Sequence, residues 1–179
     1  MESWSGRARI DSVGYRLVRD FRSTVEDAAL SPLFAACREA EPGFDFRHLS
    51  QLEGPLWALV RQRPPNLLAP RYSSWDALLL DSVDEVIARL WRPDTGFTTR
   101  TWGGHNTVRI RHPLSPGLLL FISRFLDMAP VELPGDSSMP RVQGVNFGAS
   151  ERMVVEPGHE EEGIFEMPVG ESGYPLSPY

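Results

Sequence analysis

Residues 73–93 read SSWDALLLDSVDEVIARLWRP, and residues 107–113 read TVRIRHP. In the first stretch apolar side chains recur every three or four positions, which predicts a helix with one broad apolar face. Ser73 or Ser74 is expected to cap this helix, and Arg92-Pro93 to end it. In the second stretch the pattern repeats every two residues, which predicts a strand ending at Pro113. The change of period predicts an α+β fold class, with a helix-rich first half followed by antiparallel strands.

The residues before this stretch also have a helical period. Val13, Leu17, Phe21 and Val25 predict one helix. Ser31-Pro32 has the character of an N-cap followed by proline in the first turn, which predicts a second helix running through Leu33, Phe34 and Cys37. A third helix is predicted from near Ser50 until Arg63, where Pro64-Pro65 ends it.

The residues after Pro113 predict shorter elements. A short helix is expected over 116–128, and two strands over 152–156 and 163–167. The acidic turn 157–162 between these strands favours a hairpin. The whole chain, residues 1–179, is interpreted as a single partial domain with a helical part (1–93) and a strand-rich part (94–179).

Composition excludes several kinds of function. All 18 basic residues are Arg and there is no Lys, which rules out a Schiff-base or P-loop lysine and disfavours nucleic-acid binding. One cysteine, Cys37, cannot form an internal disulfide or a cysteine-based zinc site. The charge is uneven: residues 125–179 hold two Arg against ten acidic residues.

No apolar run, including the longest near Leu118 to Ile122, approaches the roughly 18 residues needed to span a bilayer, so no membrane partner is expected. Residues 1–9 have no signal-peptide core, which makes the cytoplasm the default expectation for this chain taken alone.

The local motifs that suggest chemistry are incomplete. His159-Glu160 lacks the second histidine of a metalloprotease motif, because Gly163 stands there. His48, His105, His112 and His159 have no metal-ligand spacing. The segment 170–173 (GESG) is one residue too short for a nucleophile elbow. Glu160 to Glu162 are interpreted as a solvated charge run, and Cys37 as a small buried hydrophobic residue. No catalytic, cofactor-binding or metal-ligating residue is therefore assigned, and no cofactor is expected.

Five later segments carry a more specific signal. They are TWGGHNTV (101–108), RHPLS (111–115), LPGD (133–136), GASERMVV (148–155) and PVGESGYPLSPY (168–179). In order and content they resemble segments in the C-terminal part of the β subunit of penicillin acylases. Trp4, Gly6 and Arg7, followed by Asp11-Ser12, resemble the W-x-G-R stretch that opens the last helical part of that subunit. The resemblance therefore covers essentially the whole chain.

This resemblance implies an N-terminal-nucleophile amidohydrolase with an αββα core. In that family a serine freed at the β-subunit N-terminus attacks an amide carbonyl while its own α-amine acts as base. This chain has no Gly-Ser dipeptide, and Ser3 lies behind Met1-Glu2. The family's nucleophile, oxyanion asparagine and calcium ligands belong upstream of the matched part. Glu171 also replaces the usual Gln, and Tyr179 follows Pro178 without the usual intervening residue.

The resemblance leaves several interpretations open. In the first, the chain is a fragment of an acylase of β-lactam side chains or acyl-homoserine lactones, and is inactive alone. In the second, it is an association module, one half of a split acylase whose partners are the α subunit and the N-terminal part of the β subunit; the apolar stripe of the Trp75 to Leu90 helix would then be an interface. In the third, it is a free-standing helical binding protein. Full-length relatives are often periplasmic or secreted, so localisation stays open.

Overall fold

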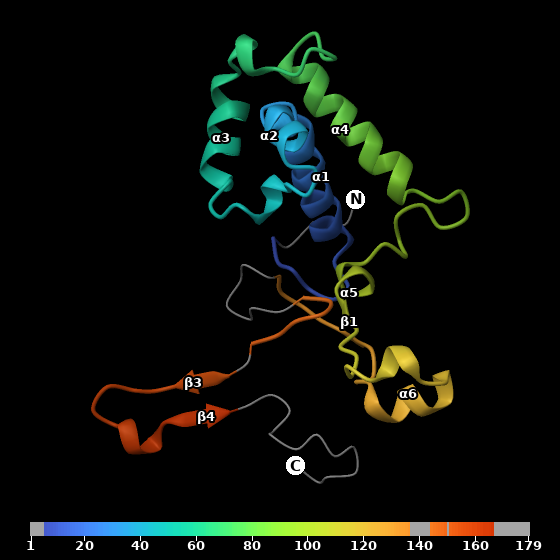
Figure 1. Cartoon of the computed structure of the whole chain (residues 1–179), viewed down its shortest axis with the longest axis vertical. Helices are drawn as coiled ribbons and strands as arrows, with labels where there is room; N and C mark the ends of the chain where they lie inside the picture. Colours follow the sequence, from blue (N-terminus) through green and yellow to red (C-terminus); the bar gives the residue numbers. More distant parts are fainter. Residues whose placement is uncertain (1–5, 137–143, 150, 167–179) are drawn as a thin grey trace. The chain divides into compact units, whose positions relative to one another are not determined.

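The structure is a computed structural model, and it describes residues 6–136, 144–149 and 151–166 (Figure 1). The chain is helix-rich and carries two small antiparallel sheets of two strands each, which confirms the α+β class. It forms two compact units, one of Val13–Arg100 and one of Met1–Ser12 with Thr101–Tyr179. Residues 1–12 therefore group with the later part of the chain.

Four helices build the Val13–Arg100 unit: α1 (Val13–Leu30), α2 (Ala35–Ala40), α3 (Glu53–Gln62) and α4 (Trp75–Leu90). Within this unit α1 lies between α3 and α4 and packs mainly against α4 (Figure 1). As predicted, Ser74 caps α4, because its hydroxyl oxygen accepts the backbone N–H of Ala77 at 3.0 Å. Helix α3 ends at Gln62, and the next residue, Arg63, takes the left-handed conformation.

The core of this unit comes from the apolar positions predicted to share helix faces. Its buried members are Val25, Ala28, Ala29, Leu56, Trp75 and Leu78. Trp75, Leu78, Val86 and Leu90 are buried, so this part of the predicted apolar stripe of α4 belongs to the core of the unit. Only Leu80, Val83 and Ile87 of this helix are left as exposed large hydrophobic residues.

Two predictions about α2 are wrong. The helix begins at Ala35 and has no side-chain cap, because Ser31 and Pro32 form a turn that leads directly out of α1. The Ser31 N–H still donates to the backbone carbonyl of Asp27 in α1, and the Arg38 side chain donates to the Ser31 carbonyl. Cys37, predicted to be buried, is exposed, and none of the six residues of α2 is buried.

The second unit holds α5 (Trp102–His105), β1 (Thr107–Val108), α6 (Leu120–Leu126) and β2 (Val131–Glu132). Strands β1 and β2 pair antiparallel, with Thr107 opposite Glu132. The strand predicted over 107–112 is shorter in the structure, because the backbone after Val108 forms hydrogen bonds with two segments other than β2. The Arg109 N–H donates to the Val145 carbonyl, and the Ile110 carbonyl accepts the N–H of Met128.

The helix expected over 116–128 is shorter in the structure. Ser115–Gly117 forms a 3₁₀ turn, Leu118 and Leu119 are extended, and α6 follows. The predicted hairpin is confirmed: β3 (Arg152–Val154) and β4 (Ile164–Glu166) pair antiparallel, with Met153 opposite Phe165. In the described parts of the chain, no helix combines the length and apolar character that crossing a membrane requires.

Candidate functional site

The residues first considered for chemistry lie in separate segments of the chain. His48 ends the 3₁₀ turn Phe46–His48, and His105 ends α5. His112 accepts the N–H of Leu114 at its Nδ1. Ser3 and the segment 170–173 lie outside the described residues. The described chain therefore does not bring these groups together into a catalytic arrangement.

One small cluster was missed in the sequence because it depends on how the acidic turn is wound. One ligand atom each of His159, Glu161 and Glu162 lies within 4.8 Å of the others, and all three residues are exposed. Glu160 turns away, because its carboxylate accepts the N–H of Gly158 at 3.0 Å, which lowers the pKa of Glu160. Exposed groups of this kind commonly remain solvated, so no metal role is assigned.

The motif segments around Trp102 and Gly135 do meet in space. The indole N–H of Trp102 donates to the Gly135 carbonyl at 2.6 Å. The Asn106 amide donates to the Leu133 and Gly135 carbonyls at 3.1 and 3.2 Å. Trp102 and Asn106 are both buried. Because the Asn106 amide is used to satisfy buried backbone carbonyls, its role is to fix the fold, and it is not available to stabilise an oxyanion.

The same junction holds the segment before α1. The Gly103 N–H donates to the Ile10 carbonyl, and the Gly135 N–H to the Ala8 carbonyl, both at 2.8 Å. A Cβ on Gly103 would lie 2.5 Å from the Ile10 side chain and 2.6 Å from the Glu132 carboxylate. A side chain at position 103 would therefore collide with these neighbours, which explains structurally why the motif has glycine there.

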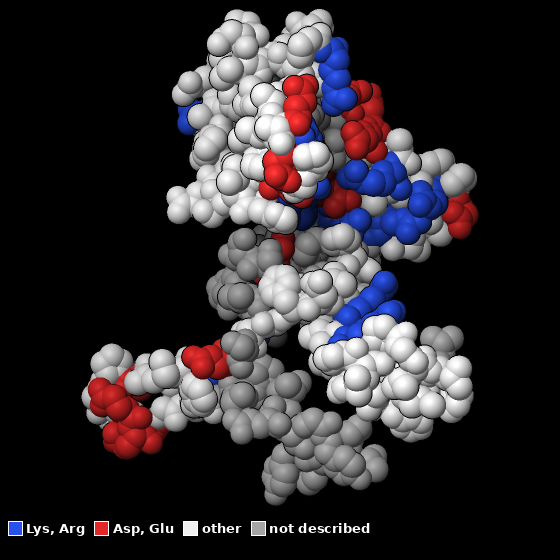
Figure 2. Space-filling view, viewed as in Figure 1, with Lys and Arg blue, Asp and Glu red and all other residues white. Residues whose placement is uncertain are grey.

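Apolar side chains are exposed over two elements of the same unit. We call the first the α6 surface: Leu114, Leu118, Leu119, Phe121, Ile122, Phe125 and Met128. The face of α6 seen in Figure 2 is almost entirely uncharged. We call the second the hairpin surface: Met153, Val154, Val155, Ile164 and Phe165. Contiguous exposed apolar surface of this kind marks interaction sites in soluble proteins.

The hairpin surface is apolar on both sides of the strands. Successive strand residues point to opposite faces, and Met153, Val154, Ile164 and Phe165 are each 60–67% exposed. A two-stranded hairpin without a packed face is marginally stable in water. The tip of the hairpin is charged, because the acidic side chains of Glu160–Glu162 lie there (Figure 2).

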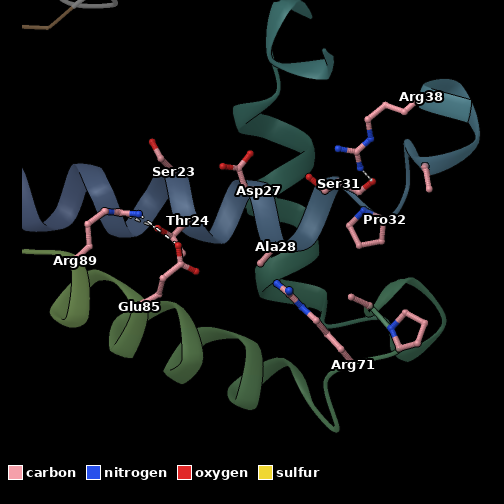
Figure 3. Close-up of a pocket in the computed structure, with 13 residues that line it drawn as sticks. Ser23, Thr24, Asp27, Ala28, Ser31, Pro32, Arg38, Arg71, Glu85 and Arg89 are labelled. Carbon is pink, nitrogen blue, oxygen red and sulfur yellow. Dashed lines mark hydrogen bonds and ion pairs between the residues drawn. The ribbon is translucent and has the colours of Figure 1, made fainter. Parts of the chain in front are cut away.

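A separate cavity of about 480 Å³ lies within the Val13–Arg100 unit (Figure 3). Its lining residues are Ser23, Thr24, Asp27, Ala28, Ser31, Pro32, Ala35, Arg38, Ala69, Pro70, Arg71, Glu85 and Arg89. They come from α1, the turn before α2, α2 itself, the segment before α4, and α4. No single sequence motif contains this combination, so only the tertiary structure reveals the cavity.

A comparison with protein families agrees with the motif segments. The family model described as Penicillin amidase matches residues 1–179. No curated protein matches the chain. The match spans the full sequence. The interpretation of the chain as a free-standing helical protein that resembles the family by chance is therefore set aside. The chain belongs to the penicillin amidase family.

Proposed function

We propose that the chain is a non-catalytic part of a penicillin-acylase-type amidohydrolase. The complete enzyme would hydrolyse linear amide bonds, such as those of acylated β-lactams or acyl-homoserine lactones, by attack of an N-terminal serine. This chain would supply the C-terminal part of the β subunit. It would join the α subunit and the N-terminal part of β, which carry the nucleophile.

The observation that carries this proposal is the exposure of the hairpin and α6 surfaces. Phe125 is 75% exposed and Phe165 is 60% exposed, although both belong to runs of apolar residues. Burying such a side chain is worth about 1.5–3 kcal/mol, so covering several of them would drive association. The buried junction around Trp102 and Asn106 supports a structural role for the family motifs in this chain.

Co-expression tests the association directly. The chain is produced together with the α subunit and N-terminal β part of a penicillin acylase, and co-purification and amide hydrolysis are measured. We expect a complex that hydrolyses a chromogenic phenylacetyl anilide. We expect Phe125→Asp and Phe165→Asp each to reduce complex formation at least tenfold, because a charge would be buried against apolar surface.

Leu33→Asp is the matched control. Leu33 is 42% exposed and lies in the turn before α2, outside both surfaces, so this change introduces the same charge without affecting association. Loss of the complex in all three variants, or in none, would contradict the proposed surfaces.

The sequence of the flanking DNA separates two forms of the proposal. An upstream frame ending in acylase sequence, shifted or interrupted, would identify a broken gene. An intact, separately transcribed upstream subunit would identify a split enzyme.

A further inference from the structure

The cavity of the Val13–Arg100 unit has arginines on several sides. Figure 3 shows Arg89 reaching toward Thr24, Arg71 toward Ala28, and Arg38 toward Ser31, all of which belong to α1 or the turn that follows it. These three arginines come from α4, the segment before α4, and α2. Side chains from three segments therefore bring guanidinium groups to one hollow.

The arginines differ in how their charge is compensated. Arg89 is ion-paired with Asp20 at 3.6 Å and Glu85 at 3.4 Å. Within the described part of the chain, Arg38 and Arg71 have no carboxylate within ion-pairing distance. Arg38 bonds only the backbone carbonyl of Ser31. The charges of Arg38 and Arg71 are therefore available to a bound anion.

Arg71 is held in place without using its hydrogen-bond donors on an acid. Its Cζ lies 4.7 Å from the ring centroid of Tyr72, which is within the range of a cation–π contact. The Tyr72 hydroxyl in turn donates to Asp81 of α4 at 2.9 Å. Burial, followed by this hydrogen bond to Asp81, raises the pKa of Tyr72, so the ring remains neutral in the physiological range.

The remaining lining is small, mostly apolar, and offers little opposing charge. Ala28 and Ala69 are buried, and prolines 32 and 70 with Ala35 complete the apolar part. Of the two acidic residues, Glu85 is paired with Arg89. Asp27 is exposed and points to the Ser23 side of α1, away from the side that Arg71 approaches (Figure 3). The net charge left for a ligand near Ala28 is positive.

We propose that this cavity binds a small organic carboxylate. The planar fork of Arg71 can donate two parallel hydrogen bonds to a carboxylate, and Arg38 of α2, which lines the same cavity beside Ser31, adds a second positive charge. The alanines and prolines contact the apolar body of the ligand. An inorganic anion would satisfy the arginines but leave this apolar surface uncovered. The proposal is independent of the proposed function, since it needs no amide hydrolysis and no partner chain.

The test compares benzoate with benzamide, which has the same shape and no charge. Backbone ¹H–¹⁵N spectra of the full chain are recorded during each titration, with inorganic phosphate as a third ligand. We expect benzoate to shift the amides of Ala28, Ser31 and Ala69 with a dissociation constant on the order of 1 mM. Benzamide and phosphate should bind at least tenfold more weakly.

Variants locate the binding on the two arginines. Arg71→Gln and Arg38→Gln should each weaken benzoate binding about tenfold or more, as expected for loss of a charge-assisted hydrogen bond. Arg71→Lys keeps the charge but not the fork, so it should bind with intermediate affinity. Arg61→Gln is the control, because Arg61 lies over Trp57 of α3, outside the cavity. Circular dichroism of each variant is used to check that its helices are retained.

Three outcomes would overturn the proposal. Equal binding of benzamide would mean that no carboxylate is recognised. Equal binding of phosphate would mean that the apolar wall contributes nothing. Unchanged benzoate affinity in Arg71→Gln, or shifts confined to residues outside the cavity, would place the binding elsewhere.

Discussion

Asp20 links α1 and α4 through ion pairs in which its own side chain is largely buried. Its carboxylate lies 3.0 Å from Arg16 one turn earlier on α1 and 3.6 Å from Arg89 on α4. The side chains of Asp20 and Arg16 are only 12% and 15% exposed. Burial is the largest influence on Arg16 and lowers its pKa, although Asp20 acts in the opposite direction. The pairing therefore matters because an unpaired charge would be costly here.

Asp20→Asn tests this network. Removing one partner leaves Arg16 uncompensated, and we expect the free energy of unfolding to fall by about 2–3 kcal/mol, somewhat below the cost for a fully buried pair. Urea unfolding followed by far-UV circular dichroism measures the change. Asp76→Asn is the control, because Asp76 and its partner Arg63 are 68% and 47% exposed, so its loss should cost less than about 1 kcal/mol. Equal losses in the two variants would contradict the role of burial.

Asp127 ties the segment before α6 to the residue that follows the helix. Its carboxylate accepts the Ser115 hydroxyl and the His112 N–H, and these bonds, the serine first, lower the pKa of Asp127. A lowered pKa contributes stability above the unfolded value of about 3.9, and this stability is lost as the pH falls through the folded value. We predict that the His112 amide resonance titrates with a midpoint below about 3.9. Asp127→Asn should abolish the titration, and a midpoint above that value would contradict the account.

Helix α4 shows how one element divides between core and surface. Leu78 is fully buried against α1, whereas Leu80, two residues later, is 66% exposed. We predict that Leu78→Ala lowers the free energy of unfolding by about 2–5 kcal/mol, because it leaves a cavity. Leu80→Ala is the matched control and should change it by less than about 1 kcal/mol. Similar effects in thermal or urea unfolding would mean that α4 packs through a different face.

Helix α4, which a local pattern defines, was predicted well, whereas the local pattern at Ser31-Pro32 misplaced the start of α2. The Ser74 cap and the apolar period of α4 involve residues within one helix, so the sequence alone contains the information. The strand after Thr107 was predicted too long, because Arg109 and Ile110 bond Val145 and Met128, which lie far along the chain. The exposure of Cys37 and the cavity beside α1 likewise depend on how distant segments pack, and a periodic pattern does not encode that.

At the scale of the whole molecule, the family is one of amidohydrolases, but no catalytic residue is assigned among the described residues of this chain. The penicillin amidase match covers residues 1–179, while Trp102 and Asn106 of the motif segments donate hydrogen bonds to buried backbone carbonyls and hold segments together. The apolar α6 and hairpin surfaces remain exposed. These features are consistent with the proposal that the chain contributes structure to an amidohydrolase and leaves the nucleophile to another part of it.

The most direct test is an amidase assay on the purified chain with a chromogenic phenylacetyl anilide. The account predicts no turnover above the uncatalysed rate, with or without a serine-directed acylating inhibitor. Turnover that this inhibitor abolishes would contradict it, because the chain would then contain its own nucleophilic serine.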